Sequence, residues 1–444
     1  MASTASVLAL AGTARAEVGI GTGTGTGQTL AQKLIAQACG RGRVAVGEIV
    51  TCGVDMAMFH DSSGPRRLQP MLEDLGAQIW DKSRVVLVMD HYVPERDDDA
   101  RRIVRIARDW AREQDLPHVY DSMGICHVVV PQHGHIRPGM LCVGGDSHSP
   151  TGGAFGAYMF GVGSTEMLGV VVTGEIWLRV PETIRMWWDH ELPRGVTAKD
   201  MMLHMIGRFG MNGGRYQAIE FAGPAVTALS MQERMTLSNM SAELGAQAGL
   251  IAPDATTAAF LAEAGAPPVD AAPWFTDVDA AFTEHRFDAA TLEPHVAAPH
   301  SPANSQGVSH YAGTPIDVAY IGACTGAKLQ DLRAAAEVLR GHKVAAGIRL
   351  IVAPASLRDQ EQARAEGVLQ ALMDAGAELF PTACGACAGY GDPMGDDITV
   401  MSTTARNFRG RMGSPSASVY LGSPYTVAAA ALRGRVTDPR EVLA

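Results

Sequence analysis

The stretch Asp317-Val-Ala-Tyr-Ile-Gly-Ala-Cys-Thr-Gly326 joins an apolar run of strand length to a cysteine, and it begins the most regular part of the chain. Further strand-like runs follow at residues 349–352, 378–380, 398–401 and 418–421. Helical periodicity separates these runs, with one helix starting near Lys328 and another running to about Ala375. Short apolar runs that alternate with helices predict an α/β fold with mostly parallel sheets.

The same alternation is present nearer the N-terminus. A helix is expected from Thr29, and strands are expected at residues 85–88 and 140–143. The middle of the chain has longer helical stretches, including one from about Ser230 to Ala248 with Gly249 as its stop. A stretch rich in Pro, Ala, His and Ser at residues 293–309 predicts a connector between domains.

The bulk composition narrows the class of protein. A chain of 444 residues is too long for one hydrophobic core, so two or three domains are expected. No apolar run reaches membrane-spanning length, which argues against a membrane protein. The net charge of −11 makes nucleic acid an unlikely partner, and an anionic substrate would need a local cluster of Arg or His.

The first 27 residues are dominated by Ala, Thr and a Gly-Thr repeat, which predicts a flexible tail. Ala14-Arg-Ala16 resembles a signal-peptide cleavage site, but no basic segment precedes it and the apolar run is weak. The seven cysteines form no regular framework, which favours a reducing compartment. A cytoplasmic protein is therefore expected.

Three cysteines, Cys324, Cys384 and Cys387, follow predicted strands. Because ligands bind at the carboxyl ends of parallel strands, they are expected to share one site. A cubane iron–sulfur cluster held by three thiolates instead of four leaves one iron open as a Lewis acid. The Cys-x-x-Cys spacing also suits zinc or a redox pair, and Cys324 could be an ordinary buried residue.

Acidic and imidazole side chains gather at other predicted strand ends. Asp90-His91 follows one strand, Asp146 and His148 follow another, and His127 lies between them in the sequence. A carboxylate beside a histidine can orient the ring for general acid–base work. For one isolated pair, a polar strand end without a role is the simpler interpretation; the recurrence favours a site.

Two further patterns are weaker when taken alone. Arg406-Asn-Phe-Arg-Gly-Arg411 places three arginines after a predicted strand, where guanidinium groups could bind the carboxylates of a dicarboxylate. A solvated basic loop would have the same composition. Asn239 and Glu243 are four residues apart and are expected to share one helix face, which is also an ordinary surface pattern.

Taken together, these motifs resemble the aconitase superfamily. The similarity runs from about Thr29 to the C-terminus and is greatest to the stand-alone large subunits of 3-isopropylmalate dehydratase and homoaconitase. The residues that carry it are Gly145-Asp-Ser-His-Ser-Pro-Thr-Gly-Gly153, Gly161-Val-Gly-Ser-Thr-Glu166, Ile321-Gly-Ala-Cys-Thr325, Cys384-Gly-Ala-Cys387 and Ser402-Thr-Thr-Ala-Arg-Asn-Phe-Arg-Gly-Arg411.

The resemblance implies three α/β/α domains around a [4Fe-4S] cluster, without a swivelling fourth domain. The expected divisions are a tail at 1–27, domain 1 at 28–185, domain 2 with its linker at 186–305, and domain 3 at 306–444. It implies cluster ligation by Cys324, Cys384 and Cys387. It also implies acid–base and water-handling roles for Asp90, His91, His127, Asp146, His148 and Glu243, and substrate binding by Asn239, Arg406 and Arg411.

The implied reaction is the elimination and re-addition of water on a hydroxy-dicarboxylate, which is hydro-lyase chemistry of the kind used in leucine biosynthesis. In the family, the base that removes the C–H proton lies on the swivelling domain. A separate small subunit is therefore expected to complete the site. Gly326 and Ala405 replace asparagines that are usual in the family, so the substrate could be isopropylmalate, methylmalate, dimethylmalate, maleate or homocitrate.

Two other classes of function remain as alternatives. The chain could be a cluster-bearing RNA-binding regulator, although its acidic charge argues against that. It could also be an inactive paralogue, given Gly326 and Ala405, although the three cysteines and both Asp–His motifs argue against that.

Overall fold

The computed structural model describes residues 18–20, 26–390 and 393–443. Most of the predicted flexible tail, residues 1–17 and 21–25, therefore lies outside the described residues. The remaining part includes β1 (Val18–Ile20), which pairs antiparallel with β12 (Thr283–Asp288). No helix in the described ranges combines the length and the apolar character needed to cross a membrane.

The first part of the chain forms a parallel sheet in the strand order β5-β4-β3-β6-β7. Its strands are β3 (Met56–His60), β4 (Val85–Met89), β5 (His118–Asp121), β6 (Leu141–Gly144) and β7 (Tyr158–Gly161). The helices around it are α1 (Leu30–Ala38), α2 (Pro65–Leu75), α3 (Asp98–Glu113), α4 (Cys126–Gln132) and α5 (Ser164–Thr173), with 3-10 turns η1 (Lys82–Arg84) and η2 (Ser149–Phe155). A separate ribbon pairs β2 (Ile49–Gly53) with β8 (Glu175–Arg179). The strands predicted at 85–88 and 140–143 correspond to β4 and β6.

The middle part forms a second sheet in the order β1-β12-β9-β10-β11. Its other elements are β9 (Thr183–Asp189), β10 (Ala218–Ala222), β11 (Ala248–Leu250), α6 (Ala198–Phe209), α7 (Pro224–Ala228), α8 (Met231–Met240), α9 (Ala255–Glu263) and η3 (Ala289–Thr291). Apart from the β1 pairing, these strands run parallel.

The long helix predicted from Ser230 to Ala248 is wrong in its second half. The helix does begin where predicted, with Ser230 as the N-cap in a capping box with Glu233, but it ends at Met240. The chain then turns through Gly245, whose φ of 79° suits glycine, and enters β11, where Ala248–Leu250 pair with β10. Gly249 is therefore a strand residue, because sheet pairing overrides the local helical pattern.

The last part forms a seven-stranded sheet in the order β14-β13-β19-β18-β15-β16-β17. The five predicted strands are all present, as β15 (Val318–Ile321), β16 (Arg349–Val352), β17 (Ala377–Leu379), β18 (Thr399–Ser402) and β19 (Ser418–Leu421). The helical elements are α10 (Val308–Tyr311), α11 (Leu329–Leu339), α12 (Leu357–Ala365), α13 (Val368–Ala375), α14 (Pro424–Arg433), η4 (Gly385–Ala388) and η5 (Pro439–Glu441). The helix predicted to end near Ala375 is two helices, because Gly367 between them has a φ of 70°.

The connector predicted at residues 293–309 is also wrong. These residues form β13 (His295–Ala297), β14 (Ser305–Gly307) and the start of α10, and β13 pairs antiparallel with both β14 and β19. Val296 and Ala297 are fully buried, so this short apolar pair has a place in the third sheet although its neighbours are polar and Pro-rich.

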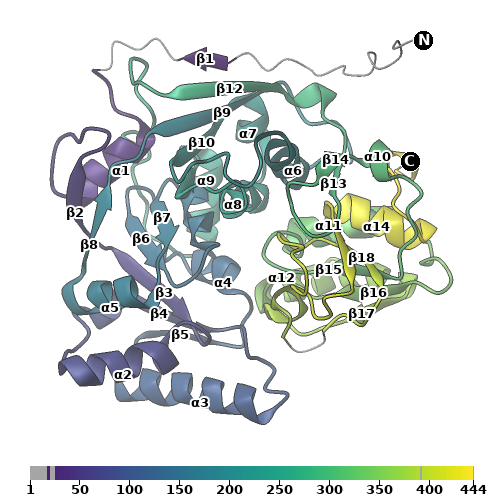
Figure 1. Cartoon of the computed structure of the whole chain (residues 1–444), viewed down its shortest axis with the longest axis horizontal. Coiled ribbons are helices and arrows are strands. Elements are labelled where there is room, and N and C mark those ends of the chain that lie inside the picture. Colours follow the sequence, from purple (N-terminus) through teal and green to yellow (C-terminus); the bar gives the residue numbers. More distant parts are fainter. Residues whose placement is uncertain (1–17, 21–25, 391–392, 444) are drawn as a thin grey trace, which may run out of the picture.

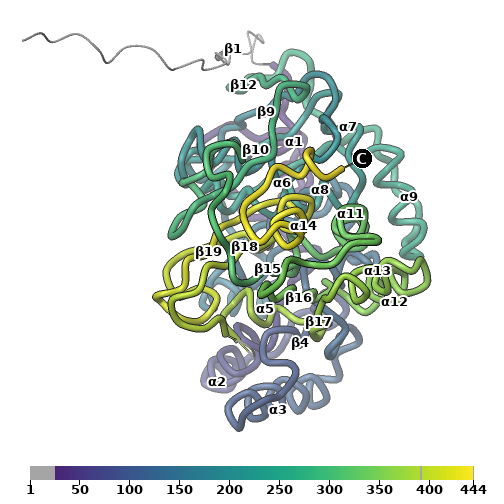
Figure 2. Tube along the Cα trace, turned by 90° about the vertical axis from the view of Figure 1, so that its right-hand side faces the viewer, coloured from purple at the N-terminus to yellow at the C-terminus, as the bar shows by residue number. Residues whose placement is uncertain are grey.

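The three sheets pack into one body (Figure 1). One face of the third sheet is covered by α11, α13 and α14, whose Leu332, Leu372 and Val427 share a core with Ile321 of β15. Tyr320 on the opposite face belongs instead to a core shared with the middle part of the chain. Figure 2, viewed from the side of the third sheet, shows the C-terminal part in front and α2 and α3 at the base.

A close backbone contact locks the first part of the chain to the second. A Cβ added at Gly153, in η2, would overlap the carbonyl oxygen of Gly249 in β11. Gly153→Ala should therefore force the two segments apart and destabilise the fold by about 1–3 kcal/mol, as overpacking does. The expected result is a lowered melting temperature, measured by circular dichroism.

Gly169 is the matched control, because it lies within α5 and a Cβ there would meet no atom within 4 Å. Gly169→Ala should raise the melting temperature slightly, since alanine favours a helix over glycine by about 1 kcal/mol. An unchanged melting temperature for Gly153→Ala would contradict this account of the contact.

Candidate active site

A cavity of about 420 Å³ lies where the carboxyl ends of strands from the first and third sheets meet. Nine of the twelve residues expected from the sequence line it, and they are His91, His127, Asp146, His148, Cys324, Cys384, Cys387, Arg406 and Arg411. The other three lie directly behind this lining. Asp90 contacts His91, Glu243 contacts His148, and Asn239 contacts Cys324.

Asp90 and His91 form the first hydrogen-bonded pair, directly after β4. Nδ1 of His91 lies 2.7 Å from Oδ1 of Asp90, whose other oxygen accepts from the backbone N–H of Cys126. Burial alone would lower the pKa of His91, but the charge and hydrogen bond of Asp90 outweigh it and raise that pKa to about 9. His91 is therefore a protonated imidazolium at neutral pH.

His60 lines the cavity as well, although the sequence analysis gave it no role in the site. It is the last residue of β3, next to β4, and its ring stacks on that of His91 with centroids 4.0 Å apart. Burial and the neighbouring His91 lower its pKa to about 3, so the ring is neutral. The dipeptide His60-Asp61 at a strand end was the available signal, because it mirrors Asp90-His91 on the adjacent strand.

Two histidines and two aspartates at the ends of β3 and β4 are spaced closely enough to hold a metal ion. Ligand atoms of His60, Asp61, Asp90 and His91 lie within 4.8 Å of one another. The Asp61 carboxylate already accepts hydrogen bonds from the backbone N–H groups of His91 and Tyr92. Its oxygens therefore fix the loop that carries His91.

A second pair joins His127 of α4 to Asp146. Nε2 of His127 lies 2.8 Å from Oδ2 of Asp146, and Oδ1 of Asp146 accepts from the backbone N–H of His148. Although burial favours the neutral acid, the charge of His127 and its hydrogen bond hold the pKa of Asp146 well below its usual value. Asp146 is therefore an ionised carboxylate that orients the ring of His127 and holds the backbone of His148.

Glu243 connects all three parts of the chain. Its Oε1 lies 2.9 Å from Nε2 of His148 and accepts a hydrogen bond from Nε of Arg406 at 2.5 Å. Burial opposes ionisation, but the charges of Arg406 and His148 hold the pKa of Glu243 below its usual range. Because α8 ends at Met240, Glu243 lies on the following turn, so the expectation that it shares a helix face with Asn239 is wrong.

The three cysteines lie at the carboxyl ends of β15 and β17. Cys324 and Cys387 are buried, and Sγ of Cys324 accepts a hydrogen bond from Nδ2 of Asn239 at 3.3 Å. A hydrogen bond between Cys384 and Cys387 raises the pKa of Cys384 and lowers that of Cys387 to about 5. These thiols share one cavity, and all three are free.

Gly326 has a structural explanation, whereas nothing in the structure explains Ala405. A Cβ at Gly326 would overlap the side chain of Thr403, which itself hydrogen-bonds to the backbone of Gly322. An asparagine at position 326 would therefore need Thr403 to move. Ala405 is buried directly before Arg406.

Arginines supply positive charge on two sides of the cavity. Arg406 and Arg411 come from the loop after β18, and Nε of Arg411 is buried without a hydrogen-bond partner among the described residues. Arg66 and Arg67, in the first turn of α2, also line the cavity and were missed by the sequence analysis. Two adjacent arginines at the start of a helix do not indicate a binding site in the sequence, because only the fold brings them to the cavity.

The profile of the aconitase family (aconitate hydratase) matches residues 33–434. The chain therefore belongs to the aconitase family, and it is a hydro-lyase enzyme. Its α/β fold is that of the family.

Curated relatives match almost the whole chain. The 3-isopropylmalate dehydratase large subunit 1 of Methanopyrus kandleri is 42% identical over 94% of this chain and 100% of its own length. The 3-isopropylmalate dehydratase large subunit 1 of Archaeoglobus fulgidus is 40% identical over 94% and 99%. The probable methanogen homoaconitase large subunit of Methanosarcina mazei is 41% identical over 88% and 99%.

Proposed function

We propose that this chain is the large subunit of an iron–sulfur hydro-lyase that dehydrates and rehydrates a 2- or 3-hydroxy-dicarboxylate of the alkylmalate class, with 3-isopropylmalate as the first candidate. The observation that carries the proposal is one cavity lined by three free cysteines, by His91 and by four arginines. The names of the most similar relatives support the choice of substrate class.

The residues of the cavity fit a [4Fe-4S] cluster. Cys324, Cys384 and Cys387 provide three thiolates, which is one fewer than a closed cluster uses. Asn239 Oδ1 and Glu243 Oε2 are buried polar atoms without a hydrogen-bond partner in the described part of the chain, as expected where a bound group would lie beside them. When bound, such a cluster supplies a Lewis-acidic iron for a substrate hydroxyl.

The side chains divide the remaining work. Arg406 and Arg411 bind the substrate carboxylates, since a guanidinium can donate two parallel hydrogen bonds to one carboxylate. His91 donates the proton that the leaving hydroxyl needs, and Asp90 stabilises its charged form. His127 and His148 are each fixed by a carboxylate, so they orient the water that departs and returns.

The proposal includes a separate small subunit that completes the active site. The relatives that match 94% of this chain are named large subunits, and the match covers 99% or more of their own length. In the family, the base that removes the C–H proton lies outside the three domains to which this chain corresponds. We therefore assign that base to the partner, together with part of the pocket for the alkyl group.

A homoaconitase is the second candidate function. The observation that favours it is the 41% identity to a probable homoaconitase large subunit. A homologous tricarboxylate would also use the additional positive charge of Arg66 and Arg67 at the cavity.

The cysteine assignment predicts the metal content of variants. Cys324→Ser, Cys384→Ser and Cys387→Ser, purified without oxygen after reconstitution, should each lose most of their iron, sulfide and broad visible absorbance. Cys39→Ser is the control, because Cys39 caps α1 and bonds to the carbonyl of Ala36, away from the cavity. Full iron content in all three site variants would contradict the assignment.

The function itself is tested by combining the reconstituted chain with a candidate small subunit, sought in the same genome as a protein about the size of one domain. The ultraviolet absorbance of the unsaturated product should appear with both proteins present and be absent with either alone. Homocitrate and methylmalate run in parallel identify the substrate. Full turnover by this chain alone would contradict the proposal that a small subunit is needed. An iron-loaded pair that binds RNA and shows no turnover would favour the alternative of an RNA-binding regulator.

His91→Asn should lower kcat by about 10²–10⁴-fold, which is the usual contribution of a positioned acid or base. Iron content should stay unchanged, because His91 is not assigned to the cluster. His190→Asn is a matched control, since His190 also lies 2.8 Å from an aspartate but is exposed on the surface. Equal kcat values for the two variants would exclude His91 as the acid.

A further inference from the structure

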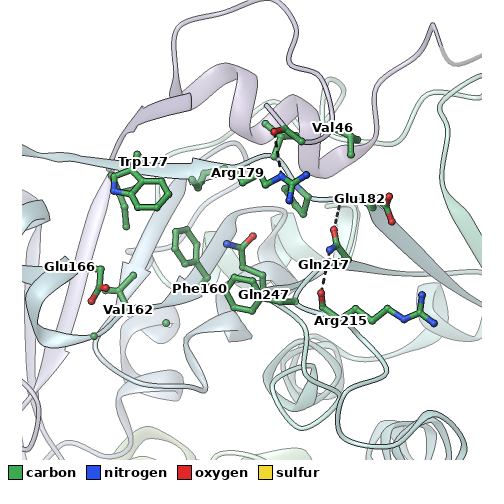
Figure 3. Close-up of a pocket in the computed structure, with 18 residues that line it drawn as sticks. Val46, Phe160, Val162, Glu166, Trp177, Arg179, Glu182, Arg215, Gln217 and Gln247 are labelled. Atoms are coloured by element: carbon green, nitrogen blue, oxygen red, sulfur yellow. Dashed lines mark hydrogen bonds between the residues drawn. The ribbon is translucent and has the colours of Figure 1, made fainter. Parts of the chain in front are cut away.

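A second cavity, which we call the β8 groove, lies beside the catalytic cavity and has a volume of about 600 Å³ (Figure 3). It is bounded by Val46, Val162, Trp177, Arg179, Tyr216 and Gln247. Val162 and Gly163 line both cavities, so the two share a wall.

The rim of the β8 groove is apolar and exposed. Trp177 is 70% exposed, Tyr216 64% and Val46 49%, and Ile49 of the neighbouring strand β2 is 68% exposed. Arg179 and Arg215 also line the groove, with Glu166 and Glu182 as its acidic groups. Exposed aromatic side chains beside arginines are the composition of protein–protein interfaces, where Trp, Tyr and Arg contribute most of the binding energy.

The backbone along the groove is open as well. Residues 176–182 all line it, and they include most of β8. Within the part of the chain that the structure describes, β8 pairs only with β2. The other edge of β8 therefore faces the groove, and a free strand edge can accept an extended segment of another chain.

A buried polar group points into the same space. Gln247 is only 7% exposed, and its Oε1 accepts a hydrogen bond from the hydroxyl of Tyr158. Its Nε2 has no hydrogen-bond partner among the described residues, and Figure 3 shows the carboxamide beside Phe160, turned toward the middle of the groove. This amide nitrogen can therefore donate a hydrogen bond to an acceptor that a partner brings to the groove.

We propose that the β8 groove is the docking surface for the small subunit, an inference that rests on the proposed function. The partner must reach the catalytic cavity to complete it. A subunit that packs on Trp177 and Tyr216 lies next to Val162 and Gly163, which also line the catalytic cavity. The groove thus holds the partner by apolar contacts and strand pairing, while the adjoining cavity receives its catalytic group.

The test measures binding of the same small subunit to the iron-loaded chain by isothermal titration calorimetry. Trp177→Glu and Tyr216→Glu should each raise Kd at least tenfold, with iron content and circular dichroism unchanged because both side chains are exposed. Saturating small subunit should restore kcat, since neither residue belongs to the catalytic cavity. Met373→Glu, at a 41% exposed position on α13, is the control and should leave Kd unchanged.

The outcomes separate this inference from the function on which it rests. If both groove variants bind the small subunit as tightly as the wild-type chain does, the docking surface is overturned and the proposed function stands. A wild-type chain that binds no small subunit overturns both. A wild-type dimer that Trp177→Glu converts to a monomer, seen by light scattering, would assign the groove to a second copy of this chain and overturn the proposal.

Discussion

The geometry of the site depends on the buried carboxylate of Glu243. One of its oxygens contacts His148 from the first part of the chain and Arg406 from the third, while Glu243 itself belongs to the second. An uncompensated carboxylate at full burial would destabilise the fold by several kcal/mol. The arrangement of the three sheets that brings the imidazole and the guanidinium to this carboxylate is therefore favoured over one that leaves it unpaired, and it also assembles the cavity.

Two buried lysines fix the loops that carry the cysteines and Arg406. Nζ of Lys328 donates to the carbonyl of Cys324 at 2.9 Å and is balanced by Asp331. Nζ of Lys199, on α6, donates to the carbonyls of Thr403 and Thr404, just before Arg406. Burial lowers the pKa of Lys199 to about 7. Both loops are thus positioned by the protein itself.

The sequence predicted local elements well and long-range pairing poorly. The five strands from β15 to β19 follow from apolar runs bounded by turns, and the cysteines and Asp–His motifs follow from their places at strand ends. By contrast, β13 and β11 are three-residue strands defined by their pairing, β13 with β14 and β19 and β11 with β10. The same holds for His60, Arg66 and Arg67, whose importance depends on neighbours from other segments.

The distribution of charge in the cavity bears on how the substrate is chosen. Asp90, Asp146 and Glu243 are each matched by a histidine or arginine, while Arg66 and Arg67 form no ion pair with an acidic side chain in the described ranges. Positive charge therefore remains at the cavity of a chain whose net charge is −11, and it can draw in an anionic substrate. Carboxylate recognition of this kind does not distinguish one alkyl group from another. If the partner surface over the cavity distinguishes one alkyl group from another, large subunits for different hydroxy acids should be about equally similar to this chain. Relatives named as large subunits of 3-isopropylmalate dehydratase and of homoaconitase are indeed 42% and 41% identical to it.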